Sequence, residues 1–229
     1  MKQFALSVSV CALLLAGCTD SKEASKGNFK TAINGWIEKH PPCISVPRGQ
    51  VSPAEKSNAA FPRYVDASPL TAKFAQESRA RVEAPLAALA DAGLLTVKDA
   101  SIQIKAGLFG DGLKEIPVHA YELSDDGKKA VATEGEQTAF NAAAPKFCYG
   151  TPTVDEILQY TEPAEAMGMK LSQVTYRYHL NDVPTWAGNS KLKATYPDLV
   201  RNTAASLEGK AAVILTNEGW VHEKASGLH

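Results

Sequence analysis

The stretch MKLSQVTYRYHLN, residues 169–181, carries the clearest β-strand pattern of the chain. Along it, apolar and aromatic side chains alternate with polar ones: Val174, Tyr176, Tyr178 and Leu180 against Thr175, Arg177 and His179. Successive side chains of a strand point to opposite faces of its sheet. The stretch therefore predicts a strand with one buried face and one wet face.

The segment around this strand supplies the rest of a sheet. Strand candidates lie at residues 146–149, 154–161 and 210–224. The last of these is a hairpin, KAAVILT-NEG-WVHEK, in which Asn217 and Gly219 suit the positive φ that tight turns require. A helix is expected over residues 198–206, behind a proline. Residues 145–229 are therefore predicted to form an antiparallel β-sheet half with one helix.

The residues before this half favour helices. A helix capped by Asn28 is expected to run to about Lys39, where two prolines end it. A short strand, residues 43–46, follows. Ser68 is expected to cap a second helix, and Pro85 either kinks that helix or begins a third, over residues 85–92.

The next passage resembles part of a known domain family. VEAPLAALADAGLLTVK at 82–98, the strand IQIKAGL and then IPVHAYELSDDGKKAV at 116–131 resemble the last helix and wing hairpin of winged-helix domains. The resemblance covers about residues 79–131 and implies helices followed by a β-hairpin. An ordinary amphipathic helix capped by Gly93 is the alternative.

Most winged-helix domains bind DNA through a basic helix. Here that helix carries only Arg79 and Arg81 before an acidic, alanine-rich end, and the whole chain has a formal net charge of −1. No nucleic acid partner is expected from this balance, and a scaffold used for packing or protein contact is favoured. The predicted class is α+β, with a helical winged-helix-like half at 29–135 and the sheet half at 145–229.

The N-terminus has the layout of a secretory signal. Lys2 precedes an apolar run that is shorter than the roughly 20 residues a bilayer-spanning helix needs. Leu15-Ala16-Gly17-Cys18 then resembles the lipobox of bacterial lipoproteins. A cysteine that happens to end the apolar run is the alternative. The polar residues after Cys18 read as a flexible spacer, so residues 1–17 are expected to be a signal peptide and residues 18–28 a lipidated tether.

The lipobox resemblance implies both a modification and a place. Cleavage before Cys18 and acylation of its thiol would make this residue the start of the mature chain, with the membrane as a partner through its acyl chains. Thr19, where an aspartate would retain a lipoprotein at the inner membrane, implies the periplasmic face of the outer membrane.

Cysteine count bears on the remaining fold. Of four cysteines, Cys11 would leave with the signal and Cys18 would carry lipid. Cys43 and Cys148 remain in an oxidising compartment, where a disulfide between them is expected. Two separate free thiols are the alternative. No C-x-x-C spacing supports a catalytic or metal-binding role for either cysteine.

A recognition surface is the first functional candidate outside the N-terminus; the second, Asp182 with Trp186 in a turn closed by a proline, favours a structural role. Tyrosine and arginine are enriched in such surfaces because they join an apolar face to a polar tip. The candidates are Tyr176, Arg177, Tyr178 and His179, with Tyr149 and Tyr160 on neighbouring strands. The alternative is that the tyrosines build the sheet core while Arg177 and His179 form its wet face.

Catalytic motifs are missing from the sequence. It has no G-x-S-x-G elbow and no phosphate-binding glycine loop, and no pair of histidines has metal-ligand spacing. No cofactor or metal is therefore expected. The sequence favours a lipid-anchored periplasmic lipoprotein with a binding or assembly role in the cell envelope, with an envelope protein as partner. A periplasmic protein that binds a small ligand, or an enzyme acting on envelope material, is the alternative.

Overall fold

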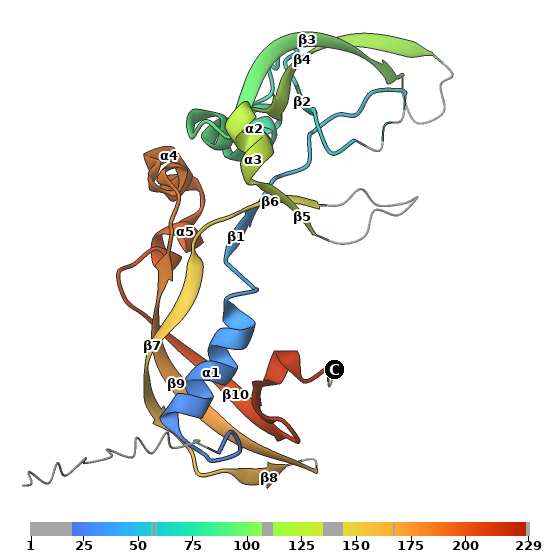
Figure 1. Cartoon of the computed structure of the whole chain (residues 1–229). Helices are drawn as coiled ribbons and strands as arrows, with labels where there is room; N and C mark the ends of the chain where they lie inside the picture. The colour runs from blue at the N-terminus through green and yellow to red at the C-terminus, as the bar shows by residue number, and fades with distance from the viewer. Residues whose placement is uncertain are drawn as a thin grey trace, which may run out of the picture.

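The chain combines helices with antiparallel sheets. The computed structural model describes residues 20–55, 57, 59–106, 112–134, 144–166 and 168–227. It has the α+β class that the sequence predicts. Figure 1 shows two lobes stacked along a long axis, with α1 in the lower lobe and α2 and α3 in the upper lobe. Among the described residues, no helix has the length and apolar character to cross a membrane.

The lower lobe is built around the strand that the sequence predicts over residues 169–181. Strand β9, Met169–Asn181, pairs on one side with β10 and on the other with β7, all antiparallel. The other strands of this sheet are β7 (Thr151–Tyr160), β8 (Ala164–Ala166), β10 (Leu207–Thr216) and β11 (Gly219–His222). In the turn between β10 and β11, Gly219 has the expected positive φ of 128°, whereas Asn217 does not take one.

The side chains of β9 alternate between a buried face and an exposed face, as the sequence predicts. Val174 and Tyr176 are buried, whereas Arg177, the residue after Tyr176, is exposed. Helix α1, Lys26–Ile37, covers the buried face through Phe29 and Ile33. Burying the apolar stripe of one helix against an apolar sheet face removes both from water, which is the main favourable term in folding.

Helix α1 begins three residues earlier than the sequence predicts. Its N-cap is Ser25, whose hydroxyl accepts the backbone N–H of Asn28. The Asn28 side chain instead donates to the carbonyls of Asp20 and Glu23, at 2.8 and 2.9 Å. Residues 26–28, which the sequence assigns to the tether, are therefore the first turn of this helix.

The upper lobe consists of a long hairpin packed on a helix. Its elements are β2 (Arg63–Asp66), α2 (Lys73–Asp91), β3 (Leu95–Lys105), β4 (Leu113–Leu123) and α3 (Asp125–Ala130), and its sheet has the order β2-β4-β3. Helix α2 followed by the β3–β4 hairpin is the helix-then-hairpin succession expected from the sequence. Helix α1, however, lies on the sheet of the lower lobe and does not pack beside α2.

Helix α2 begins later than the sequence predicts, and no third helix begins at Pro85. It runs through Pro85 without a break, because Leu86 and Leu89 continue the buried face that Val82 borders. It begins at Lys73, with no side-chain cap, instead of behind Ser68. The Ser68 backbone is used elsewhere: its N–H donates to Asp66 and its carbonyl accepts from the Arg79 guanidinium.

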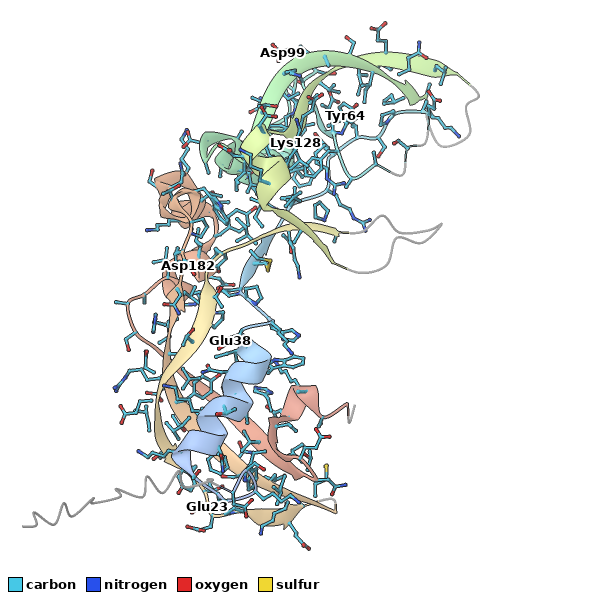
Figure 2. All side chains as sticks on the ribbon, viewed as in Figure 1. Glu23, Glu38, Tyr64, Asp99, Lys128 and Asp182 are labelled. Atoms are coloured by element: carbon cyan, nitrogen blue, oxygen red, sulfur yellow. A yellow bond between two sulfur atoms is a disulfide. The ribbon has the colours of Figure 1, made fainter. Side chains whose placement is uncertain are left out.

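A third, small sheet joins the lobes at the waist of the molecule. Its strands are β1 (Cys43–Ser45), β6 (Ala144–Cys148) and β5 (Val131–Glu134), in the order β1-β6-β5. Cys43 lies directly opposite Cys148 in the antiparallel register, and the two are joined by the predicted disulfide. Figure 2 shows this bond in yellow between the lobes.

Each lobe contains segments from both halves of the chain. Helices α4 (Ser190–Thr195) and α5 (Pro197–Asn202) lie between β9 and β10 in sequence, but their buried Leu192 and Leu199 belong to the same core as Leu86 of α2. Helix α1 from the first half completes the lower core. The sequence predicts one helix over 198–206; α5 corresponds to it, and α4 was not predicted.

Candidate functional site

The six residues proposed as a recognition surface lie in four different surroundings. Strand alternation sends Tyr176 and Tyr178 to the side of the lower sheet that α1 covers, and Arg177 and His179 to the opposite face. Tyr149 is buried in the upper core, where its hydroxyl accepts a hydrogen bond from Asn202 at 3.1 Å. Tyr160 packs edge-on against Phe29 with ring centroids 4.9 Å apart.

A pocket lies beside Tyr176 and Tyr178 at the waist. Its volume is about 180 Å³, and its walls come from the end of α1, the segment leading to β1, strands β7, β9 and β10, and α5. The lining residues are Ile37, His40, Pro42, Pro152, Tyr176, Tyr178, Leu180, Asn202 and Leu207. Glu38, labelled in Figure 2, is next to the lining residue Ile37 at this end of α1. We call this cavity the waist pocket.

Two tyrosines give the waist pocket its chemistry. Their rings are tilted by 46° with centroids 5.7 Å apart. Burial raises the pKa of Tyr176 to about 12 and also raises the pKa of Tyr178. Both phenols therefore stay neutral across the physiological range, and each offers a hydroxyl that donates or accepts beside an apolar ring.

A glycine sets the position of the deeper tyrosine. Gly209 on β10 lies directly opposite Tyr176 on β9, and the ring covers it. A Cβ at Gly209 would stand 2.5 Å from the Tyr176 ring carbon Cζ and 2.7 Å from its hydroxyl oxygen. The missing side chain at this position thus lets the tyrosine lie flat on the neighbouring strand.

His40 adds a nitrogen to the pocket wall. Its ring is stacked on Trp36, with centroids 3.5 Å apart and planes at 15°. Its Nδ1 lies 2.8 Å from the Trp36 carbonyl oxygen, which can only accept, so Nδ1 carries the proton. In the neutral ring, Nε2 is then the acceptor, and the pocket combines tyrosine hydroxyls with an imidazole on otherwise apolar walls.

The opposite face of β9 carries a polar network of different character. His179 Nδ1 lies 2.7 Å from Asp155, and its Nε2 lies 2.8 Å from the Asn181 side-chain oxygen. The Asn181 amide nitrogen in turn donates to the hydroxyl of Thr153 at 2.8 Å. The hydrogen bonds to Asn181 and Asp155 raise the pKa of His179, since both acceptors favour a ring with two N–H groups.

Arg177 belongs to the same outer face. Its guanidinium lies 3.4 Å from a carboxylate oxygen of Glu156, and both side chains are about half exposed. Exposed ion pairs of this kind contribute at most about 1 kcal/mol. Arg177 and His179 thus form a solvated surface on the far side of the sheet from the waist pocket.

Two further sequence predictions concern metal binding and lipidation. Within the part of the chain that the structure describes, no three His, Cys, Asp or Glu side chains are grouped to hold a metal ion. Cys18 lies outside the described residues.

Sequence reasoning missed the pocket residues that do not lie on β9. The sequence marks Pro42 as a helix stop and places Asn202 in a helix, and His40 carries no motif. Gly209, which lies under the ring of Tyr176 and does not line the pocket, also carries no motif. One signal was available for Gly209: a lone glycine within a strand indicates close approach of a neighbouring group.

Comparisons with known proteins add no family to this description. The chain matches no protein-family model, and searches of curated proteins and of solved structures found no significant similarity.

Proposed function

We propose that the protein is a lipid-anchored lipoprotein of the cell envelope, held at the periplasmic face of the outer membrane by acyl chains on Cys18. Its role is binding or assembly, with another envelope protein as partner. The observation that carries the proposal is the lipobox Leu15-Ala16-Gly17-Cys18, which directly follows the apolar run of a signal peptide.

The disulfide supports an exported protein. Disulfides persist in the periplasm and outside cells but are rare in the cytosol, where thiols are kept reduced. The bond between Cys43 and Cys148 joins adjacent strands of the waist sheet, so it is part of the fold. A chain with this bond is suited to the oxidising side of the inner membrane.

A protein partner suits the winged-helix-like segment better than DNA does. Arg79 is one of the three basic residues of α2, with Lys73 and Arg81, and its guanidinium donates to the Ser68 carbonyl at 2.6 Å. That contact holds α2 to the loop before it and leaves the arginine partly buried. The acidic residues Glu77, Glu83 and Asp91 balance these charges, so α2 brings no net positive charge to a phosphate backbone.

The anchor is tested by replacing the lipobox cysteine. Cys18→Ser should move the protein from the membrane fraction to the soluble periplasm, and intact mass of the wild type should show loss of residues 1–17 and gain of acyl chains. Cys11→Ser, the matched control within the apolar run, should leave anchoring unchanged. Wild-type protein that retains residues 1–17 or lacks acyl mass would refute the proposal.

A second function, small-ligand binding, is favoured by the waist pocket. Ligand sites are concave, mostly apolar and carry a few polar groups, and this pocket has that composition. Its volume of about 180 Å³ is below the ~300–1,000 Å³ typical of sites for drug-sized ligands. The ligand class that fits is therefore a small ring with one polar substituent. If the protein is an enzyme, its substrate would bind in the same pocket.

Phenol and indole are suitable probes for this second function. Binding followed by NMR shifts should weaken several-fold in Tyr178→Ala, because the ring forms part of the wall. Arg177→Gln, one residue away on the outer face, is the matched control and should bind like wild type. Equal weakening in both variants, or no shift of pocket residues with either probe, would count against the pocket as a site.

A further inference from the structure

The first described residues of the chain are fixed to the lower lobe. Within this segment, residues 20–25, the backbone N–H of Glu23 donates to the Asp20 carbonyl at 3.0 Å, and that of Lys22 donates to the Asp20 carboxylate at 2.9 Å. The Ser21 hydroxyl donates to the carbonyl of Glu218 in the β10–β11 turn at 3.2 Å. We call residues 20–25 the docked turn.

The docked turn fits the strands beneath it closely. The indole N–H of Trp220 on β11 donates to the carbonyls of both Lys22 and Glu23, each at 3.1 Å. Trp220 is 7 % exposed and packs edge-on against Phe29 of α1. A Cβ on Gly219 would lie 2.9 Å from the Ser21 carbonyl oxygen, so the turn lies directly on the hairpin backbone.

The docked turn limits how far an anchor on Cys18 can lie from the protein. In a mature chain that begins at Cys18, as proposed above, Cys18 and Thr19 precede Asp20. An extended chain spans at most about 3.6 Å per residue, so the Cα atom of Cys18 lies within about 7 Å of that of Asp20. A flexible tether up to residue 28 would have given a far longer reach.

From these contacts we propose that the bilayer lies against the lower end of the molecule, and this inference rests on the proposed lipidation of Cys18. That end consists of the docked turn, β8 and the β10–β11 turn. Figure 2 shows Glu23 at this end of the long axis and Asp99 of β3 at the other. The upper lobe therefore faces away from the membrane.

The chemistry of the lower end suits lipid headgroups. Its exposed side chains include charged groups of both signs, the polar Asn217 and the small apolar Ala164 and Ala166 of β8. The charged groups are Asp20, Lys22, Glu23, Glu165, Lys170 and Glu218. Such groups remain hydrated among headgroups but are costly to place in hydrocarbon. The acyl chains supply the insertion energy, at about 0.8 kcal/mol per buried methylene, and the protein surface rests at the headgroup level.

This orientation also places the waist pocket. Helix α1 starts at the docked turn and ends at Ile37, which lines the pocket. Its 12 residues span about 18 Å at 1.5 Å per residue. The pocket and the upper lobe are thus presented to the aqueous side.

The orientation is tested with acylated, full-length protein in phosphatidylethanolamine/phosphatidylglycerol vesicles. Single cysteines at Asn217→Cys and Asp99→Cys, labelled with a fluorophore under non-reducing conditions, mark the two ends. With nitroxide on the lipid headgroups, the Asn217→Cys label should be quenched several-fold more than the Asp99→Cys label.

An insertion provides the matched control. Ten Gly/Ser residues between Thr19 and Asp20 should keep the protein on the vesicles but abolish the difference in quenching. The same insertion after Gly227 should leave the difference intact. Equal quenching at both ends in acylated, bound protein overturns the orientation alone, whereas a mass without acyl chains overturns the proposed lipidation and the orientation together.

Discussion

The two lobes bury their cores in different ways. The lower lobe has a broad antiparallel sheet whose central strand alternates cleanly, and one helix closes it. The upper lobe has a long hairpin whose strand β3 is exposed along most of its length, so it depends on α4 and α5 and on the disulfide-linked waist strands for burial. The lower lobe is therefore held by its own sheet and α1, whereas the upper lobe depends on segments outside its own sheet.

Removing the disulfide should have the largest effect on this difference. The bond spans a sequence separation of 105 residues, and the chain-entropy model gives on the order of 4–5 kcal/mol for such a loop. Cys43→Ala with Cys148→Ala should lower the free energy of unfolding by about this amount in urea denaturation. Amide exchange should speed up more in β3 and β4 than in β9 and β10. Faster exchange in both lobes alike would show that they unfold as one unit.

Truncating one core leucine should come next. Leu192 of α4 is fully buried, and Leu192→Ala should cost about 2–5 kcal/mol in the free energy of unfolding. Exchange should rise in α2. Its counterpart is Ile33→Ala in α1, also fully buried, which should cost a similar amount but loosen β9. If Leu192→Ala loosened β9 as well, the separation of the two cores would not hold.

Replacing one glycine in each lobe by alanine should give different losses of stability. A Cβ at Gly127 of α3 would collide with the backbone carbonyl of Leu94, which cannot rotate away, whereas at Gly209 it meets a tyrosine side chain that can. Gly127→Ala should therefore cost more than Gly209→Ala, both within about 1–3 kcal/mol. Gly35→Ala, in open space on α1, should instead stabilise by about 0.5–1 kcal/mol. Thermal melts of the three variants measure this order, and the reverse order of the first two would contradict it.

The smallest effect concerns pH and the lower lobe. Burial lowers the pKa of His222 below its ordinary value of 6.5, so the unfolded chain binds this proton more tightly than the folded chain. Its contribution to stability is therefore present above pH 6.5 and is lost as the pH falls below that value. Urea midpoints at pH 7.5 and 5.5 should differ less in His222→Gln than in wild type.

His179 on the outer face has the opposite sign and serves as the control. Its folded pKa is raised, so its contribution is present below the unfolded pKa and is lost as the pH rises through the folded value. His179→Gln should thus lower stability at pH 5.5 more than at pH 7.5. The same pH trend in both histidine variants would argue against this assignment.

Local patterns in the sequence predicted β7, β9, β10 and β11 of the lower sheet and favoured the disulfide, but they missed β8 and did not place the strand at 146–149 in the waist sheet. The strand over 169–181 and the final hairpin follow from the pattern of neighbouring residues. The pairing of Cys43 with Cys148 was expected because Cys11 and Cys18 were assigned to the signal peptide and the lipid. Pro85 was predicted to kink its helix or to begin a new one, because local rules weigh a lost hydrogen bond. They take no account of the buried face that continues past Pro85 within the single helix Lys73–Asp91. Tertiary packing outweighed the local signal there.

The remaining features depend on long-range packing. No local pattern tells that α1 covers a sheet more than 100 residues later, or that α4 returns to α2. The waist pocket combines α1, β9 and α5, so its outline follows from the placement of whole elements. The alternation in the sequence already separates Tyr176 and Tyr178 from Arg177 and His179, but only the structure shows that the two tyrosines line a pocket.

The contact between the docked turn and the last hairpin has a consequence for the order of folding. Ser21 and Glu218 are 197 positions apart, so the beginning of the described chain meets its partner only when nearly all of the chain is present. The upper hairpin, in contrast, pairs residues that are close in sequence and can form early. A chain that emerges N-terminus first during synthesis exposes Phe29 and Ile33 until its final strands are made. The lower lobe is then the last part to close, and a chain cut short near its end leaves an apolar helix without its cover.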